Sequence, residues 1–329
     1  EARKAGQTAT SAATVPAAPA VQVKRRDLFT VLIDASRRAR KGLDATTFLR
    51  EIGMRDVTID VDTRGARSVW VVPEVSVDLE HRKRSSVISG LARINSTKGP
   101  WTVMFRSEEN ERASALSLTA SVRDLVPAAI QGLPDGLAAL GHLDVPVAID
   151  AKMDVATTGE VREAKAAVEV GRGTIDVLSN ADGPAAAVNV EGALLQLAYD
   201  PTTRSTLLKP SQVRWNHSRA TLEGVVAPAR TSDGRSGWSL QLKANEGVLA
   251  APDLGLPPVP IELFTLAGHW LPEQRRVQLT KLALHAGGAE FTADGETDVA
   301  NGVRSARFEG RAAAMPLATF KTLWPRGLA

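Results

Sequence analysis

An alternation of apolar and polar residues, which begins near residue 52 and continues almost to the end of the chain, limits the available folds more than any other feature. In the first such segment, Val57, Ile59 and Val61 alternate with polar residues. Because successive side chains of a β-strand point to opposite faces, the pattern predicts strands with one apolar and one polar face. Such strands are typical of antiparallel sheets. Long helical patterns between the segments are missing, so we predict an all-β fold with a few short helices.

The apolar positions of these segments are expected to share one face of a curved antiparallel sheet. We predict that this face stays open as an apolar groove, and the alternative is the dry core of an ordinary sandwich. The candidate lining residues are Val57, Ile59, Val61, Val75, Val77, Leu79, Val147, Ile149, Met153, Val155, Ile175, Val177, Leu195, Leu197, Tyr199, Leu240, Leu242, Leu282 and Leu284.

Short turn signals separate the segments. Asp-Gly and Asn-Gly pairs favour the two-residue turns of β-hairpins. We therefore expect turns at Asp182-Gly183, Asp233-Gly234, Asp294-Gly295 and Asn301-Gly302.

The chain divides into four parts by composition and pattern. Residues 1–23 are rich in Ala, Thr, Ser and Pro and lack periodicity, which indicates a linker or disordered leader. Residues 27–42 predict an amphipathic helix that ends in basic residues, expected either to dock onto the domain or to lie on a lipid surface. We expect residues 44–140 to form a first β unit with a short helical plug. Residues 141–329 are expected to form repeated β units with a C-terminal plug, and the two units are compatible with one continuous sheet.

The second unit repeats itself at an offset of 71 residues. The matching pairs are Tyr199 and Trp270, Pro201 and Pro272, Leu208 and Leu279, and Val213 and Leu284. A small slip is then expected, after which Ala220 and Leu222 match Ala289 and Phe291. The plugs at 126–134 and 317–325 also resemble each other. Repetition of this length indicates stacked β units, each covering the apolar edge of its neighbour.

Composition and motifs argue against several classes of function. Forty basic and 37 acidic residues leave a formal charge of +3. The basic runs are dispersed, so we expect no nucleic-acid partner. The chain contains no cysteine, which excludes disulfides and thiol catalysis. The five histidines lack the spacing of a two-ligand metal motif, and no nucleophile elbow or phosphate-binding loop is present. We therefore assign no catalytic residue, metal or cofactor, and an enzyme acting on carbohydrates or esters remains a rival hypothesis.

Tryptophans fall in or beside the expected strands. These are Trp70, Trp101, Trp215, Trp238 and Trp270, while Trp324 ends the second plug. Indole rings at a groove rim would contact polar head groups, and the alternative is packing in the core.

Three segments resemble a known family. Residues 49–80 resemble its opening hairpin, and residues 195–224 and 266–295 resemble its repeat unit. The chain is similar, over about residues 27–325, to the AsmA-like group of bacterial proteins and in particular to its YhdP-like branch. The resemblance implies a β-sheet trough in the periplasm, anchored in the inner membrane by a helix that we expect upstream of this chain. It also implies a role in phospholipid movement to the outer membrane, and it carries over no catalytic residue.

These observations lead to one functional hypothesis and a structural alternative. We expect a non-catalytic module that binds and conducts phospholipid or another acyl lipid, with envelope proteins as further candidate partners. The alternative is a structural or protein-interaction β scaffold of the cell envelope. No stretch of 18 apolar residues is present to span a membrane.

Overall fold

The computed structural model describes most of the chain from residue 50 onward. The described residues are 50–63, 66–81, 85–110, 115–130, 140–156, 158–178, 186–230, 236–250, 255–271, 276–300, 303–313 and 316. The expected leader at 1–23, the amphipathic helix at 27–42 and the plug at 317–325 lie outside them.

Almost every described residue belongs to a strand, which confirms the all-β prediction. The elements are β1 (Glu51–Thr63), β2 (Ala66–His81), β3 (Ser85–Ser96), β4 (Gly99–Asn110), β5 (Ala115–Leu125), the 3₁₀-helix η2 (Pro127–Ala129), β6 (Leu143–Asp144), β7 (Val147–Ala156), β8 (Val161–Val170), β9 (Gly173–Leu178), β10 (Ala186–Asp200), β11 (Ser205–Trp215), β12 (Ser218–Arg230), β13 (Ser236–Leu249), β14 (Val259–Leu271), β15 (Arg276–Ala286), β16 (Ala289–Ala300) and β17 (Val303–Ala313). The helix η2 lies in the first predicted plug.

The strands form one 17-stranded antiparallel sheet, in which each long strand pairs with the next long strand of the chain. Pairing passes from β5 to β7 and from β8 to β10, because β6 and β9 are short pieces that pair with each other. The β5–β7 pairing places the two predicted units, 44–140 and 141–329, in one continuous sheet.

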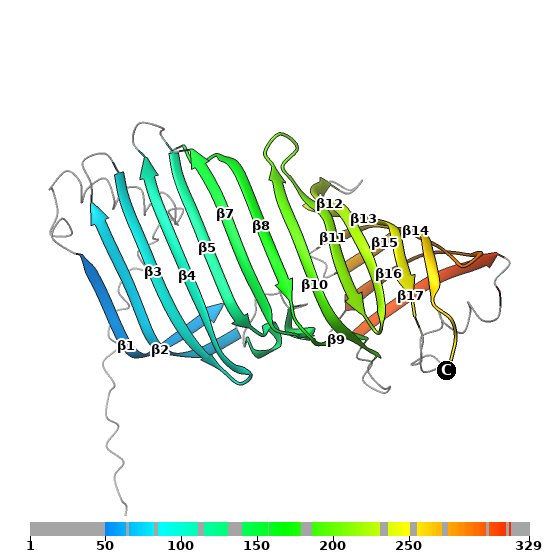
Figure 1. Ribbon diagram of the computed structural model, residues 1–329, viewed down its shortest axis with the longest axis horizontal. Coiled ribbons are helices and arrows are strands. Elements are labelled where there is room, and N and C mark those ends of the chain that lie inside the picture. Colours follow the sequence, from blue (N-terminus) through cyan, green and yellow to red (C-terminus); the bar gives the residue numbers. More distant parts are fainter. Residues whose placement is uncertain are drawn as a thin grey trace, which may run out of the picture.

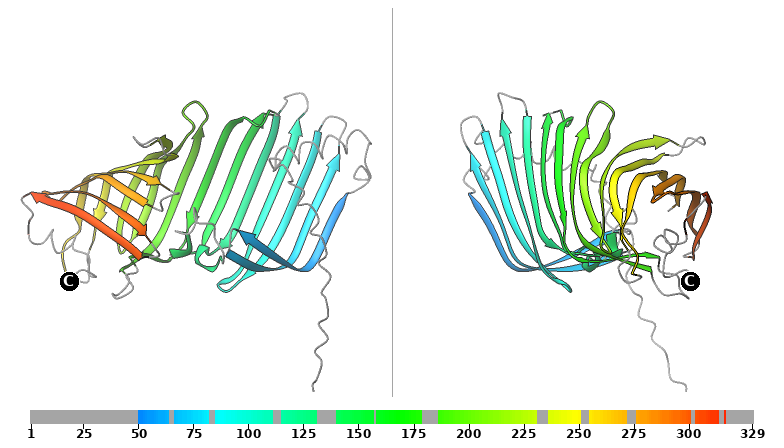
Figure 2. Two further views of the ribbon diagram at one scale, coloured as in Figure 1. Left: turned by 180° about the vertical axis from the view of Figure 1, so that it is seen from behind. Right: turned by 45° about the vertical axis from the view of Figure 1, so that its right-hand side comes forward.

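The sheet is long, curved and unclosed. In Figure 1 the strands from β1 to β10 lie side by side across the view, and the C-terminal strands curl away from that plane. The right-hand view of Figure 2 shows the curl as an open trough, with β1 and β17 far apart. The predicted curved antiparallel sheet is therefore confirmed.

Bulges at corresponding places bend the strands. The pairing register is interrupted between Val122 and Leu125 of β5, and again between Val190 and Gly192 of β10. Asp124 lies in the first bulge with φ of 59°, a left-handed conformation that Asp adopts more readily than most residues. A bulge adds a residue to one strand and so bends and twists it.

Between these two bulges, the bend brings two backbones very close together. The amide of Gly171, between β8 and β9, donates to the carbonyl of Pro146 at 2.8 Å. A methyl group at Gly173 would overlap the carbonyl oxygen of Asp144. Glycine is required here because only a residue without Cβ permits this approach.

Residues from both sides of the bend pack together on one face. Val145 and Val147 are buried in a cluster that Ile175 contacts from one side of the bend and Ile149 and Val168 contact from the other. Further buried clusters lie toward the two ends of the sheet, one made by Val72, Ile94 and Trp101 and the other by Ala220, Ala244 and Ile261. The apolar face is therefore on the inside of the bend.

The predicted repeat corresponds to a structural one. Strands β11 and β15 both have 11 residues and begin 71 residues apart, at Ser205 and Arg276. Each then has a bulge at the same place, after Leu208 in β11 and after Leu279 in β15.

The predicted slip in the repeat is wrong. Val213 lies opposite Ala220, and Leu284 lies opposite Phe291, so the offset of 71 continues through β12 and β16. Ala220 and Ala289 share a residue type but not a structural position. The face of the strand decides equivalence instead, and a large Phe291 occupies the place of a small Ala220.

One predicted turn is also wrong. Asp294-Gly295 lies inside β16, where Gly295 pairs with Leu279 of β15 and Phe308 of β17. A methyl group at Gly295 would overlap the ring of Phe308, so the glycine serves close packing in a strand. The other predicted turns, at Asp182-Gly183, Asp233-Gly234 and Asn301-Gly302, lie outside the described residues.

Candidate functional site

The candidate site is the face on the inside of the bend, called here the inner face. Residues directly opposite one another in adjacent strands point to the same face, so the register assigns each row of residues to one face. One row crosses every long strand from β1 to β17 and contains only apolar residues and glycine. This central row is Ile52, Val77, Gly90, Phe105, Ala120, Ala151, Ala166, Leu197, Leu208, Gly224, Leu242, Leu266, Leu282, Ala293 and Gly310.

The predicted lining residues lie in this row or in parallel rows of the inner face. Those whose side chains the structure describes are Val57, Val75, Val77, Leu79, Val147, Ile149, Met153, Val155, Ile175, Leu195, Leu197, Tyr199, Leu240, Leu242, Leu282 and Leu284. For Ile59, Val61 and Val177 only the backbone is described, in β1 and β9.

Burial divides the inner face into a packed part and an open part. Val147 and Val155 are buried, at 8% and 1% exposed, and belong to the packed part. Val77, Leu197 and Leu242, in the middle of their strands, are half-buried. Every described strand belongs to the same sheet, so no second layer of described strands covers these positions. The open part therefore follows the central row.

The predicted lining residues include none of the central row in β3, β4, β5, β8, β11, β12, β14, β16 or β17. Ala120, Ala151 and Ala166 lie on adjacent strands of this row. Alanine also occurs on the opposite face, at Ala167 for example, so its presence in the sequence does not reveal a face. The strand pairing assigns these residues to the inner face, and that pairing cannot be derived from the residue pattern alone.

Large side chains lie over the glycines of the central row. The ring of Phe105 occupies the space that a side chain at Gly90 would need, and Leu242 does the same at Gly224. A methyl group at Gly310 would lie 3.1 Å from the ring of Phe291. These contacts cover exposed backbone with apolar atoms and make the inner face continuous.

The tryptophans occupy both margins of the inner face. Trp70 and Trp101 meet edge to face in the bend, with ring centroids 5.7 Å apart, and Trp215 packs against the third buried cluster. Core packing therefore describes these three. Trp238 and Trp270 lie opposite each other away from the bend, and Trp238 is 44% exposed. Trp324 lies outside the described residues.

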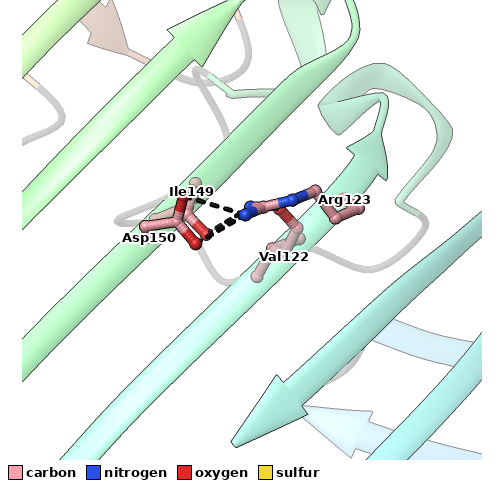
Figure 3. A network of polar contacts seen from close by, with 4 residues as sticks. All are labelled: Val122, Arg123, Ile149 and Asp150. Atoms are coloured by element: carbon pink, nitrogen blue, oxygen red, sulfur yellow. Dashed lines mark hydrogen bonds and ion pairs between the residues drawn. The ribbon is translucent and has the colours of Figure 1, made fainter.

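The opposite, outer face carries ion pairs and hydrogen-bonding side chains among a few exposed apolar ones such as Met104 and Leu207, and Figure 3 shows one of its networks. At the β5 bulge, Arg123 donates to the carbonyl oxygens of Val122 at 2.9 Å and Ile149 at 3.1 Å. It also donates to both carboxylate oxygens of Asp150. These hydrogen bonds, with a smaller contribution from Ser121, lower the pKa of Asp150 below its ordinary value.

Two other groups on polar positions have shifted pKa values. A hydrogen bond from Thr203 and one from the amide of Thr202 lower the pKa of Asp200 and order the turn between β10 and β11. Contact with Glu163 raises the pKa of Lys165. The first effect arises at an exposed turn and the second in a solvent-exposed ion pair.

The described residues contain no group of three or more side chains able to hold a metal ion. The carboxylate of Glu191 lies 3.5 Å from Nδ1 of His217, at an exposed turn. Among the same residues, no helix is long and apolar enough to cross a membrane.

Comparison with known proteins identifies no relative: no family model, curated protein or solved structure matches the chain. The class of the protein is therefore defined by its fold alone, a long antiparallel meander that is unclosed and has one apolar face.

Proposed function

We propose that the chain binds lipid acyl chains along its inner face and conducts them along the central row. The observation that supports this most is the continuity of that row, which holds no charged or hydrogen-bonding side chain from Ile52 to Gly310. A chain of methylenes requires a continuous apolar surface of this kind and no reactive group.

The solvent exposure of apolar side chains in and beside the central row supports the proposal that a ligand covers it. Phe105 is 39% exposed, and Phe308, beside the row at the β17 end, is 53% exposed. Contiguous apolar surface of this extent on a protein marks a site for a ligand, a partner or a membrane. Each methylene that such a surface removes from water stabilises the complex by roughly 0.8 kcal/mol.

The setting that we propose is the bacterial periplasm, with the chain as a module of an inner-membrane-anchored, AsmA-like protein. This part of the proposal depends on the resemblance of residues 49–80, 195–224 and 266–295 to that family. The lipid is a phospholipid or another acyl lipid that moves between the inner and outer membranes.

The test compares two neighbouring residues that face opposite ways. Leu197 lies in the central row, and Gln196 is exposed on the outer face of the same strand. Leu197→Glu places a charge on the apolar row, whereas Gln196→Glu adds the same charge on the polar face. After expression in a Gram-negative host, extracted lipid is quantified by mass spectrometry for each purified protein.

We expect lipid to copurify with the wild type and with Gln196→Glu in similar amounts. Leu197→Glu should lower it by about tenfold or more, because burying a carboxylate against acyl chains is strongly unfavourable. Absence of lipid from the wild type, or equal loss in both variants, would support the scaffold alternative instead.

A further inference from the structure

A furrow runs across the strands on the outer face, directly behind the central row. It consists of a hollow of about 710 Å³ over β4, β5, β7, β8 and β10, and one of about 520 Å³ over β11 to β14. Lys209 lines both hollows, so they adjoin. Adjacent strands are about 4.8 Å apart, which makes the furrow about 38 Å long.

The walls of the furrow are two rows of outer-face side chains, two residues apart on each strand. On β7 the walls are Asp150 and Lys152, and on β8 they are Ala167 and Lys165. The backbone between the rows forms the floor, and its amides and carbonyls are used in the sheet. A ligand in the furrow is therefore recognised by side chains and not by strand addition.

The charge of the lining is predominantly positive. Five basic residues line the two hollows, against two acidic ones, Asp150 and Glu223. Glu223 pairs at 3.0 Å with Lys243, which is one of these five basic residues, and Asp150 accepts from Arg123, which lies outside the lining. The other four basic residues, Arg106, Lys152, Lys165 and Lys209, keep the lining positive.

The cations are placed where they repel each other. Lys152 and Lys165 lie directly opposite on adjacent strands, an arrangement that destabilises a sheet. Their own ion-pair partners, Asp154 and Glu163, also lie opposite each other, in the next row away from the furrow. An alternating arrangement would be more stable, so the separation of cations toward the furrow favours an anionic ligand.

Apolar side chains lie between the cations. Met104, Leu194 and Leu207 are exposed on the outer face and line the furrow. Single-stranded nucleic acids are usually held by aromatic side chains on which the bases stack. The single aromatic residue of this lining is Phe105, whose ring packs against Gly90 on the inner face.

We infer that the outer furrow docks an extended acidic segment of another protein, in which acidic and apolar side chains alternate. At about 3.3 Å per residue, a furrow of this length holds about 11 residues of extended chain. The acidic side chains pair with the wall lysines, and the apolar ones pack beside Met104 and Leu207.

The test uses a fluorescein-labelled peptide of twelve residues that alternates Glu and Leu, with fluorescence anisotropy as the measurement. The variant Lys152→Glu/Lys165→Glu reverses two charges in the furrow. The matched control is Arg307→Glu/Arg311→Glu, which reverses two charges on exposed outer positions of β17. We expect the furrow variant to weaken binding at least tenfold, and the control to change it less than twofold.

Lys152→Gln/Lys165→Gln provides a milder change should the double reversal fail to fold, and it should weaken binding by a smaller factor. Equal weakening by the control, no binding to the wild type, or equal binding of a Lys-Leu peptide would overturn the inference. Tighter binding of heparin than of the peptide would do so as well, in favour of a glycan. The lipid content of the furrow variants should match the wild type, which separates this test from that of the proposed function.

Discussion

The guanidinium of Arg123 on β5 donates to both carboxylate oxygens of Asp150 on β7, at 2.7 and 2.9 Å (Figure 3). The same guanidinium bonds the carbonyls of Val122 and Ile149 beside the β5 bulge. A bulge interrupts the ladder and leaves backbone groups without their regular partners. The ion pair with Asp150 therefore holds the Arg123 guanidinium in the position where it donates to the backbone carbonyls beside the bulge.

Arg123→Ala is expected to lower the free energy of unfolding by more than Asp150→Asn, since it removes the donor to three residues at once. Arg123→Lys should restore stability only in part, because an ammonium cannot reproduce the planar two-pronged geometry. Urea unfolding at pH 7 measures the three variants. Equal stability of Arg123→Ala and the wild type would show that solvent replaces these bonds.

The Asp150 pair also predicts a pH dependence. The pKa of Asp150 is lowered in the folded state, so its stabilising effect is present above the unfolded value near 3.8 and is lost as pH falls through the folded value. Between pH 5 and pH 3, Asp150→Asn should therefore lose less stability than the wild type. Parallel loss in the two proteins would assign the acid sensitivity to other carboxylates.

Truncating one isoleucine in the packed bend and one on the open edge strand should have different effects on the free energy of unfolding. Ile94 is 8% exposed in the cluster with Val72 and Trp101, whereas Ile52 is 42% exposed on β1. Ile94→Ala should destabilise by about 2–5 kcal/mol through lost contacts and a cavity. Ile52→Ala should change stability by less than about 1 kcal/mol. Denaturant unfolding measures both, and similar losses would contradict the division of the inner face into packed and open parts.

Glycine substitution tests the close packing of the central row. A methyl group at Gly224 would overlap the carbonyl oxygen of Gln241 and a methyl of Leu242, whereas one at Gly53 would meet nothing within 4 Å. Gly224→Ala should destabilise by about 1–3 kcal/mol, as overpacking does. Gly53→Ala should be neutral or slightly stabilising, because alanine has less freedom in the unfolded chain. Thermal unfolding distinguishes the two, and a neutral Gly224→Ala would mean that β12 and β13 separate easily.

Much of the fold followed from residue pattern because a half-exposed sheet imposes period two on its sequence. Val75, Val77 and Leu79 showed that period clearly, and each lies on the inner face. The repeat offset was readable for a similar reason, since Leu208 and Leu279 precede equivalent bulges.

The rest could not be read because it depends on partners distant in sequence. Gly295 belongs to a strand and not to a turn because Phe308 covers it, and that contact exists only once β16 and β17 pair. The charged furrow could not be predicted for the same reason. In the sequence Lys152 and Lys165 are ordinary surface lysines, and only the strand register places them opposite each other.

Interrupting the central row far from Leu197 should separate conduction from binding. Leu242 on β13 lies in the row, and its neighbour Gln241 is exposed on the outer face. Leu242→Glu leaves the row intact from β1 to β12, whereas Leu197→Glu divides it at its middle strand, so bound lipid should fall less than in Leu197→Glu while passage through β13 is blocked by an unpaired charge. Transfer of a fluorescent phospholipid between donor and acceptor vesicles should then drop severalfold, and Gln241→Glu should behave as the wild type. If Leu242→Glu transferred lipid at the wild-type rate, the chain would hold lipid at separate sites without conducting it along the sheet.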